Sequence, residues 1–206
     1  MKIKILNSSL RKFYKKHPIA FLLTIIYFLS VIAGIVSKNY IGELTEQRII
    51  NLFKIVSAYN GSISKLDIFF YNSFINLIIF FLVFFFGLCA IGVPFILIIN
   101  AYKGFGFGFT IGIVCGIYGF KGLLISFLII IPQAILLILL LVKISEISLS
   151  FSYSIFKSIS IGARNKYELR PILEYSRNCF IIYLFSFFAV IYEVYISPYF
   201  IKIFFN

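Results

Sequence analysis

The sequence has no tryptophan and few of the residues on which protein chemistry usually depends. It contains one histidine, three cysteines and seven acidic residues among 206. The acidic residues are scattered, without the paired carboxylates of hydrolytic sites, and no second histidine accompanies His17 at metal-ligand spacing. Cys89, Cys115 and Cys179 lie in apolar stretches, which favours buried free thiols. We therefore expect no catalytic centre, metal site or cofactor, and we predict that the chain is not an enzyme.

Charge is also scarce, because 13% of the residues are charged while 62% are hydrophobic. One soluble core cannot bury so much apolar surface, so a lipid bilayer is the expected solvent. The formal net charge is +12, but the basic residues cluster outside the apolar stretches. Such clusters report membrane topology and attraction to lipid surfaces, and no nucleic acid is expected as a partner.

The N-terminal residues 1–17 carry six basic and no acidic residues, and they precede an uncharged run at 18–37. This run is long enough to cross a bilayer, and its end, Ala33 to Ser37, lacks the small-residue site of a cleaved signal peptide. It is predicted to be a retained membrane anchor. A short basic flank stays in the cytoplasm, so residues 38–67 should form an external loop.

The next uncharged stretch, residues 69–102, is too long for one perpendicular span. Gly92 and Pro94 interrupt it, and proline removes a backbone donor from a helix. We expect a helix up to about Ile91, followed by a kinked or re-entrant piece that ends at Lys103. Two full spans are the alternative.

Three further membrane segments are predicted, at residues 104–120, 122–142 and 178–201, with a cytoplasmic segment at 143–177. Serine alternates with apolar residues from Ser148 to Ile155, which fits a strand template. Because the sequence predicts no partner strand, we prefer an amphipathic continuation of the preceding helix. The prediction is one all-α membrane domain over residues 1–206, with about five transmembrane helices, the N-terminus inside and the C-terminus outside.

Glycine recurs at every fourth position in one predicted span, at Gly104, Gly108, Gly112 and Gly116. Glycines at this spacing share one helix face and let two helices approach closely in lipid. Packing against another helix of the same chain is the preferred interpretation. Contact with a second copy of the chain, or with a partner protein, is the alternative.

Pro132 and Gln133 lie in the middle of another predicted span. A polar amide at that depth needs a partner, and a backbone carbonyl released by a proline kink on a neighbouring helix is the preferred one. A transport site is the alternative, but transporters usually place ionisable groups at mid-membrane, and none is expected there. Glu193 must be protonated, paired or close to the external interface.

Three stretches resemble the stage II sporulation protein M family in both order and spacing. They are residues 103–112 (KGFGFGFTIG), 118–124 (YGFKGLL) and 131–133 (IPQ). Family members often continue after the proline with a histidine or a Gln-Asn pair, whereas Ala134 follows Gln133 here.

The resemblance implies a membrane component of the engulfment machinery of endospore-forming bacteria. Such a component assembles with two cell-wall-degrading partners at the division septum and is not itself a hydrolase. The expected function is therefore a non-enzymatic anchor in the cell membrane that localises peptidoglycan-degrading partners during engulfment. A small transporter or channel-like protein is the alternative.

Overall fold

The computed structural model describes residues 18–40, 65–160 and 169–196, and all of their secondary-structure elements are helical. The all-α prediction is therefore confirmed for this part of the chain. The basic flank with His17, most of the predicted external loop and the end of the last predicted span lie outside the described residues. The elements are α2 (Pro18–Ser37), a 3-10 turn (Lys38–Tyr40), α4 (Lys65–Gly87), α5 (Val93–Ile125), a π-helical turn (Ser126–Ile130), α6 (Ile131–Ser160), α7 (Leu169–Ile191) and a second π-helical turn (Tyr192–Ile196).

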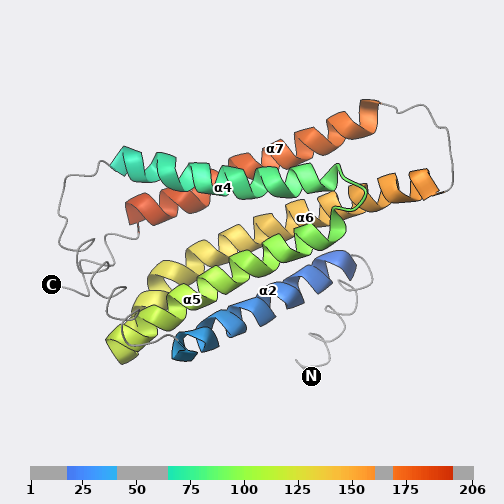
Figure 1. The fold of residues 1–206 in the computed structure, drawn as a ribbon. Helices are drawn as coiled ribbons and strands as arrows, with labels where there is room; N and C mark the ends of the chain where they lie inside the picture. Colours follow the sequence, from blue (N-terminus) through green and yellow to red (C-terminus); the bar gives the residue numbers. More distant parts are fainter. Residues whose placement is uncertain (1–17, 41–64, 161–168, 197–206) are drawn as a thin grey trace, which may run out of the picture.

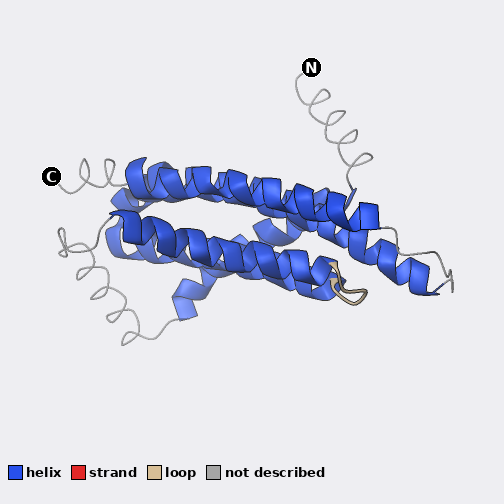
Figure 2. Ribbon diagram, turned by 90° about the horizontal axis from the view of Figure 1, so that it is seen from above, coloured by secondary structure: helices blue, strands red, loops and turns tan. Residues whose placement is uncertain are grey.

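The long helices lie side by side in one bundle (Figures 1 and 2). Helix α6 contacts α2, α4, α5 and α7, while α2 packs chiefly on α5. The apolar core combines side chains from all of these helices, including Leu23 of α2, Val83 of α4 and Ile144 of α6. Large apolar side chains also cover the outside, and Leu29 and Phe70, for example, are 62% and 66% exposed. An apolar exterior is the surface that a bilayer solvates, so the protein is a multi-pass membrane protein.

Four helical segments are long and apolar enough to cross a membrane, where five were predicted. They are Pro18–Tyr40, Leu66–Gly87, Val93–Ser158 and Pro171–Ile196. The count differs because the ranges predicted as the third and fourth spans belong to one helical segment of 66 residues.

That segment reverses direction at Gly119, which has φ 54° and ψ −128°. A positive φ is easily adopted only by glycine, because it has no β-carbon. After the reversal, Gly122 lies against the backbone of Val114 and Cys115, residues that would be more than a turn and a half away along a straight helix. Helices α5 and α6 consequently run side by side in opposite directions (Figure 1).

The break between the second and third helices also differs from the prediction. Helix α4 ends at Gly87 and α5 begins at Val93, so residues 69–102 belong to two separate helices, and the piece expected to end at Lys103 is the start of a helix of 33 residues. Pro94 stands in the first turn of α5, where its missing N–H costs nothing, and it starts a helix instead of kinking one. As a result α5 continues without interruption through Lys103.

The serine-rich segment is helical, as preferred, but its polar face is not turned to water. Ser145, Ser148 and Ser152 are completely buried in the bundle. Ser150 and Ser154 on the exposed side donate to carbonyls four residues earlier in their own helix. Helix α6 continues to Ser160, as the preferred interpretation had it, beyond the predicted end of the membrane segment at Val142.

Candidate functional site

A group of polar side chains meets in the middle of the apolar bundle. Lys103 Nζ of α5 donates to Asn76 Oδ1 of α4 at 3.4 Å. Gln133 Nε2 of α6 donates to Glu193 Oε2, beyond the end of α7, at 2.6 Å. Asn72, one turn from Asn76 on α4, is also hydrogen bonded to Glu193. We call these five residues the mid-bundle site.

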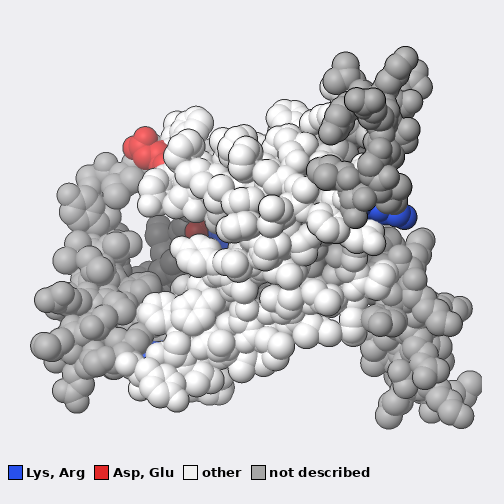
Figure 3. Space-filling model, turned by 45° about the vertical axis from the view of Figure 1, so that its right-hand side comes forward, with Lys and Arg blue, Asp and Glu red and all other residues white. Residues whose placement is uncertain are grey.

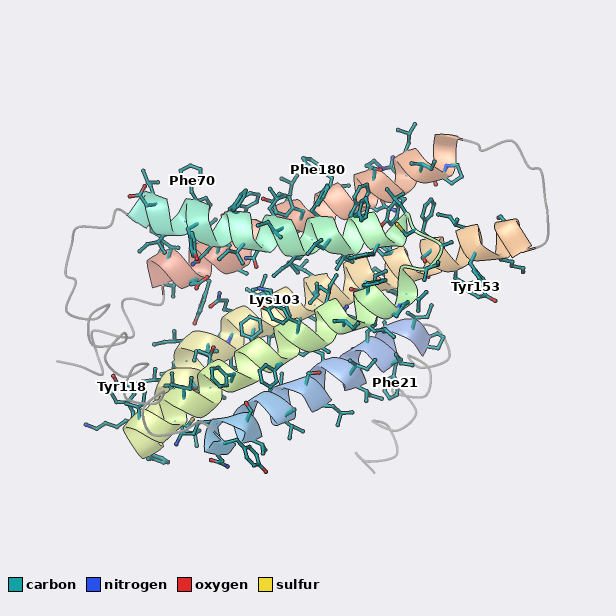
Figure 4. The ribbon with its side chains drawn as sticks, viewed as in Figure 1. Phe21, Phe70, Lys103, Tyr118, Tyr153 and Phe180 are labelled. Carbon is teal, nitrogen blue, oxygen red and sulfur yellow. The ribbon has the colours of Figure 1, made fainter. Side chains whose placement is uncertain are left out.

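The mid-bundle site lies at half the height of the bundle. Asn76 is the central residue of α4, and Gly104, next to Lys103, lies against the backbone of Tyr27 in the middle of α2. Figure 4 shows Lys103 between α4 and α5, about midway between Tyr118 at one end of the bundle and Phe21 near the other. If these helices cross a bilayer, Lys103 is far from both headgroup layers.

Two opposite charges dominate the electrostatics of this site. Lys103 and Glu193 are both half-buried and attract each other across the bundle. The ring of Phe107 lies 5.8 Å from Lys103 Nζ, within the range of a cation–π contact. In the space-filling view, red and blue atoms meet in a recess of a face that is otherwise mostly white (Figure 3). Charges in such surroundings are rare in membrane proteins and usually mark function or specific pairing.

This arrangement corrects two expectations from the sequence. Lys103 was expected at the end of a kinked or re-entrant membrane segment, and the interior was expected to lack ionisable groups. For Glu193 the sequence left three states open, protonated, paired or near the external headgroups, and the structure shows it paired with Gln133 inside the bundle. The sequence analysis did not recognise that one long helix, α5, contains Lys103. Gly92, Pro94 and Lys103 are residue types that commonly end a membrane helix, so the sequence suggested helix ends at these positions.

The structure places most of the glycine series against α2. A β-carbon on Gly108 would collide with the backbone of Val31, and one on Gly104 would come within 2.7 Å of the Tyr27 carbonyl oxygen. On Gly112 it would come within 3.0 Å of the Ile35 carbonyl oxygen. Gly116 faces the Lys38 side chain instead of backbone. Gly104, Gly108 and Gly112 therefore form an internal contact between α2 and α5.

Gln133 does not fill the role that the sequence suggested. The carbonyl of Leu128 is the one that an α-helical N–H at Pro132 would bond, and proline has no such N–H. Tyr192 supplies the missing donor, because its hydroxyl bonds the Leu128 oxygen at 2.6 Å. Gln133 is thereby left to hold Glu193.

A second polar group closes the end of the bundle near residues 88–92. The Tyr175 hydroxyl of α7 donates to the Phe84 carbonyl at 2.8 Å and lies 2.9 Å from Ser148 Oγ. Ser152 Oγ donates to the Cys89 carbonyl at 2.6 Å. Carbonyls in the last turn of a helix lack helical partners, and the Tyr175 hydroxyl satisfies that of Phe84 in α4. The Cys89 carbonyl lies beyond the end of α4 and also accepts from the N–H of Gly92. This group has a structural explanation, so the mid-bundle site remains the functional candidate.

Among residues 18–40, 65–160 and 169–196, no group of three or more His, Cys, Asp or Glu side chains is placed to hold a metal ion. Cys89, Cys115 and Cys179 are free thiols in this part of the chain.

The model of the stage II sporulation protein M family matches residues 22–198. The chain belongs to this family. The match includes all of α4 to α7 and the mid-bundle site, so both fold and site lie within the family region. No curated protein and no solved structure matches the sequence. Membership in the stage II sporulation protein M family makes this a sporulation-related membrane protein.

Proposed function

We propose that the protein is a non-enzymatic scaffold in the cell membrane that holds peptidoglycan-degrading partners at the sporulation septum during engulfment. Membership in the stage II sporulation protein M family over residues 22–198 is the observation that carries this proposal. The apolar exterior of the bundle supports it, because helices solvated by lipid can hold partners at a membrane.

We further infer five crossings, with the N-terminus inside. The reversal at Gly119 lets the segment Val93–Ser158 cross twice, which turns four helical segments into five crossings. Residues 1–17, 88–92 and 161–168 then share one side. The basic flank 1–17 has six positive and no negative residues, which favours the cytoplasm for this side.

The mid-bundle site supports a second function, transport of a proton or a small polar solute. The sequence argued against transport because the membrane interior seemed to lack ionisable groups. Lys103 and Glu193 provide an acid and a base at half the height of the bundle, where transporters bind cargo.

Glu193→Gln separates the two functions. It removes the ionisable group but keeps an amide that can still pair with Gln133. A scaffold should retain normal engulfment, measured by membrane-dye microscopy, and normal co-purification of peptidoglycan-degrading proteins from sporulating cells. A transporter should lose engulfment while abundance and partner recovery stay normal, and that result would overturn the scaffold proposal.

A control variant replaces residues 41–64, which lie on the external side in the proposed topology, with a neutral flexible linker of equal length. If the scaffold binds its partners outside the membrane, this variant should reduce partner recovery at normal abundance. Full partner recovery would show that contact is made elsewhere on the protein.

A further inference from the structure

A wide groove runs along the bundle between α4 and α5. Its volume is about 760 Å³, and apolar side chains form most of its walls. Ile78 of α4, Ile98 and Phe105 of α5 are among them, and each is at least 40% exposed. The groove therefore opens toward the space that lipid fills around a membrane protein.

The groove exposes a different face of α5 from the one that α2 covers. Gly106 lies in its wall, and a β-carbon built there would meet no atom within 4 Å. Thr110, one turn further along, also lines the groove and is exposed. Small residues four apart allow a foreign helix to approach the backbone closely, as Gly104 and Gly108 do for α2.

Lys103 is the charged residue in the wall of this groove. Its ammonium group has three donors, and its hydrogen bond to Asn76 is long, at 3.4 Å. Glu193 attracts the Lys103 ammonium group but forms no ion pair with it, since no nitrogen–oxygen distance of 4.0 Å or less joins these two described side chains. Lys103 can therefore receive a further acceptor from the groove.

The depth of Lys103 decides what kind of molecule brings that acceptor. Lys103 is level with the centres of α2 and α4, about 15 Å from either headgroup layer of a typical bilayer. A phospholipid has no acceptor at that depth, whereas a membrane-spanning helix can carry one in its middle. A second copy of this chain would have to supply a free carboxylate at this depth. Among the described residues Glu193 is the carboxylate there, and it is hydrogen bonded to Gln133 inside its own bundle.

We propose that the groove between α4 and α5 binds a transmembrane helix of another protein, and that a carboxylate in the middle of that helix pairs with Lys103. This inference rests on the scaffold function and assigns the surface by which a partner is held. In lipid, apolar helices gain little from burying apolar surface against each other. Close packing at Gly106 and one desolvated charge pair would supply affinity and register.

The test uses the full-length protein in nanodiscs and single-span Leu/Ala peptides that carry Glu, Gln or Leu at the central position. Binding is measured by energy transfer between labelled protein and labelled peptide. We expect the Glu peptide to bind at least about tenfold more tightly than the Leu peptide, with the Gln peptide between them. Lys103→Met should remove the preference, and Lys103→Arg should keep it.

Gly106→Phe should weaken binding of every peptide, because the side chain fills the groove. Ala33→Phe is the matched control, since Ala33 is an exposed small residue on α2 outside the groove. Equal binding of the Glu and Leu peptides, or a preference that survives Lys103→Met, would overturn the proposal. Labelling of the groove by a photoreactive phospholipid that the Glu peptide cannot displace would also overturn it, and so would self-association that Gly106→Phe abolishes.

The scaffold function and this inference can fail separately. If peptidoglycan-degrading proteins do not co-purify while the Glu peptide binds, the scaffold function is contradicted and the helix-binding groove is supported. If they co-purify equally with Gly106→Phe and with the unaltered protein, the scaffold stands and the groove is not the binding surface.

Discussion

The hydroxyl of Tyr192 donates a 2.6 Å hydrogen bond to the carbonyl oxygen of Leu128, a residue 64 positions earlier in the chain. Leu128 lies four residues before Pro132, so this carbonyl is the one that proline leaves without its α-helical donor. The bond fastens the end of α7 to the π-helical turn that precedes α6. It also brings Glu193, the next residue, into reach of Gln133.

Tyr192→Phe should destabilise the protein by about 0.6 kcal/mol and by no more than roughly 1.7 kcal/mol, the average and the largest value from double-mutant cycles on hydrogen bonds between membrane helices. Pro132→Ala restores a backbone N–H and should make the same change cost less. The measurement is thermal unfolding in detergent for the two single variants and the double variant. A loss that is the same with proline and with alanine at position 132 would show that the hydroxyl does not replace the missing donor.

Gly108→Leu should separate α2 from α5, because a β-carbon at Gly108 already collides with the backbone of Val31. Overpacking of this kind costs about 1–3 kcal/mol, and the protein should accumulate poorly in the membrane. Gly106→Leu is the control on the same helix, since the space beside Gly106 is open. Immunoblots of membrane fractions compare the two. Similar abundance of both variants would show that the contact between α2 and α5 accommodates a large side chain at position 108.

Gln133→Leu should destabilise the bundle, because it deprives Glu193 of its 2.6 Å hydrogen bond in apolar surroundings. Replacing both Gln133 and Glu193 by leucine should cost less than the sum of the single changes, with a coupling of about 1 kcal/mol or more. Thermal unfolding of all four proteins gives the coupling. Strict additivity would show that the two side chains do not act as a pair.

Topology is testable with single cysteines in a variant that lacks Cys89, Cys115 and Cys179. We expect a membrane-impermeant maleimide to label Lys121→Cys, beside the reversal at Gly119, in intact cells. Ile91→Cys, an exposed position between α4 and α5, should be labelled only after permeabilisation. The opposite pattern would invert the proposed orientation. Labelling of both positions in intact cells would contradict a crossing between Ile91 and Gly119.

Several features were predictable because they depend on local properties of the chain. The apolar runs predict membrane helices, since a bilayer accepts only segments whose backbone bonds are satisfied internally. The spacing of Gly104, Gly108 and Gly112 predicts a packing face, because four residues make about one helical turn. The family segments at 103–112, 118–124 and 131–133 are local as well, and they indicated the family to which the chain belongs.

The boundaries that failed depend on non-local partners. Lys103 resembles the end of a span when only the sequence is considered, since a charge in lipid is costly. It lies inside the bundle because Asn76 of α4 and Glu193, both distant in the sequence, lie close to it. Phe107, one turn further along α5, adds its ring. The serines of α6 are buried for the same reason, because Tyr175 and the Cys89 carbonyl give Ser148 and Ser152 their partners.

The sequence by itself determined that this is an all-α membrane protein of the stage II sporulation protein M family, because composition, hydropathy and short motifs are local properties of the chain. Only the tertiary structure decided that α5 runs through Lys103, that the break predicted between residues 120 and 122 is a reversal at Gly119, and that Lys103 and Glu193 share one site. The physical reason is that a polar group is stable in an apolar interior only beside a partner. Folding, not sequence order, brings those partners together.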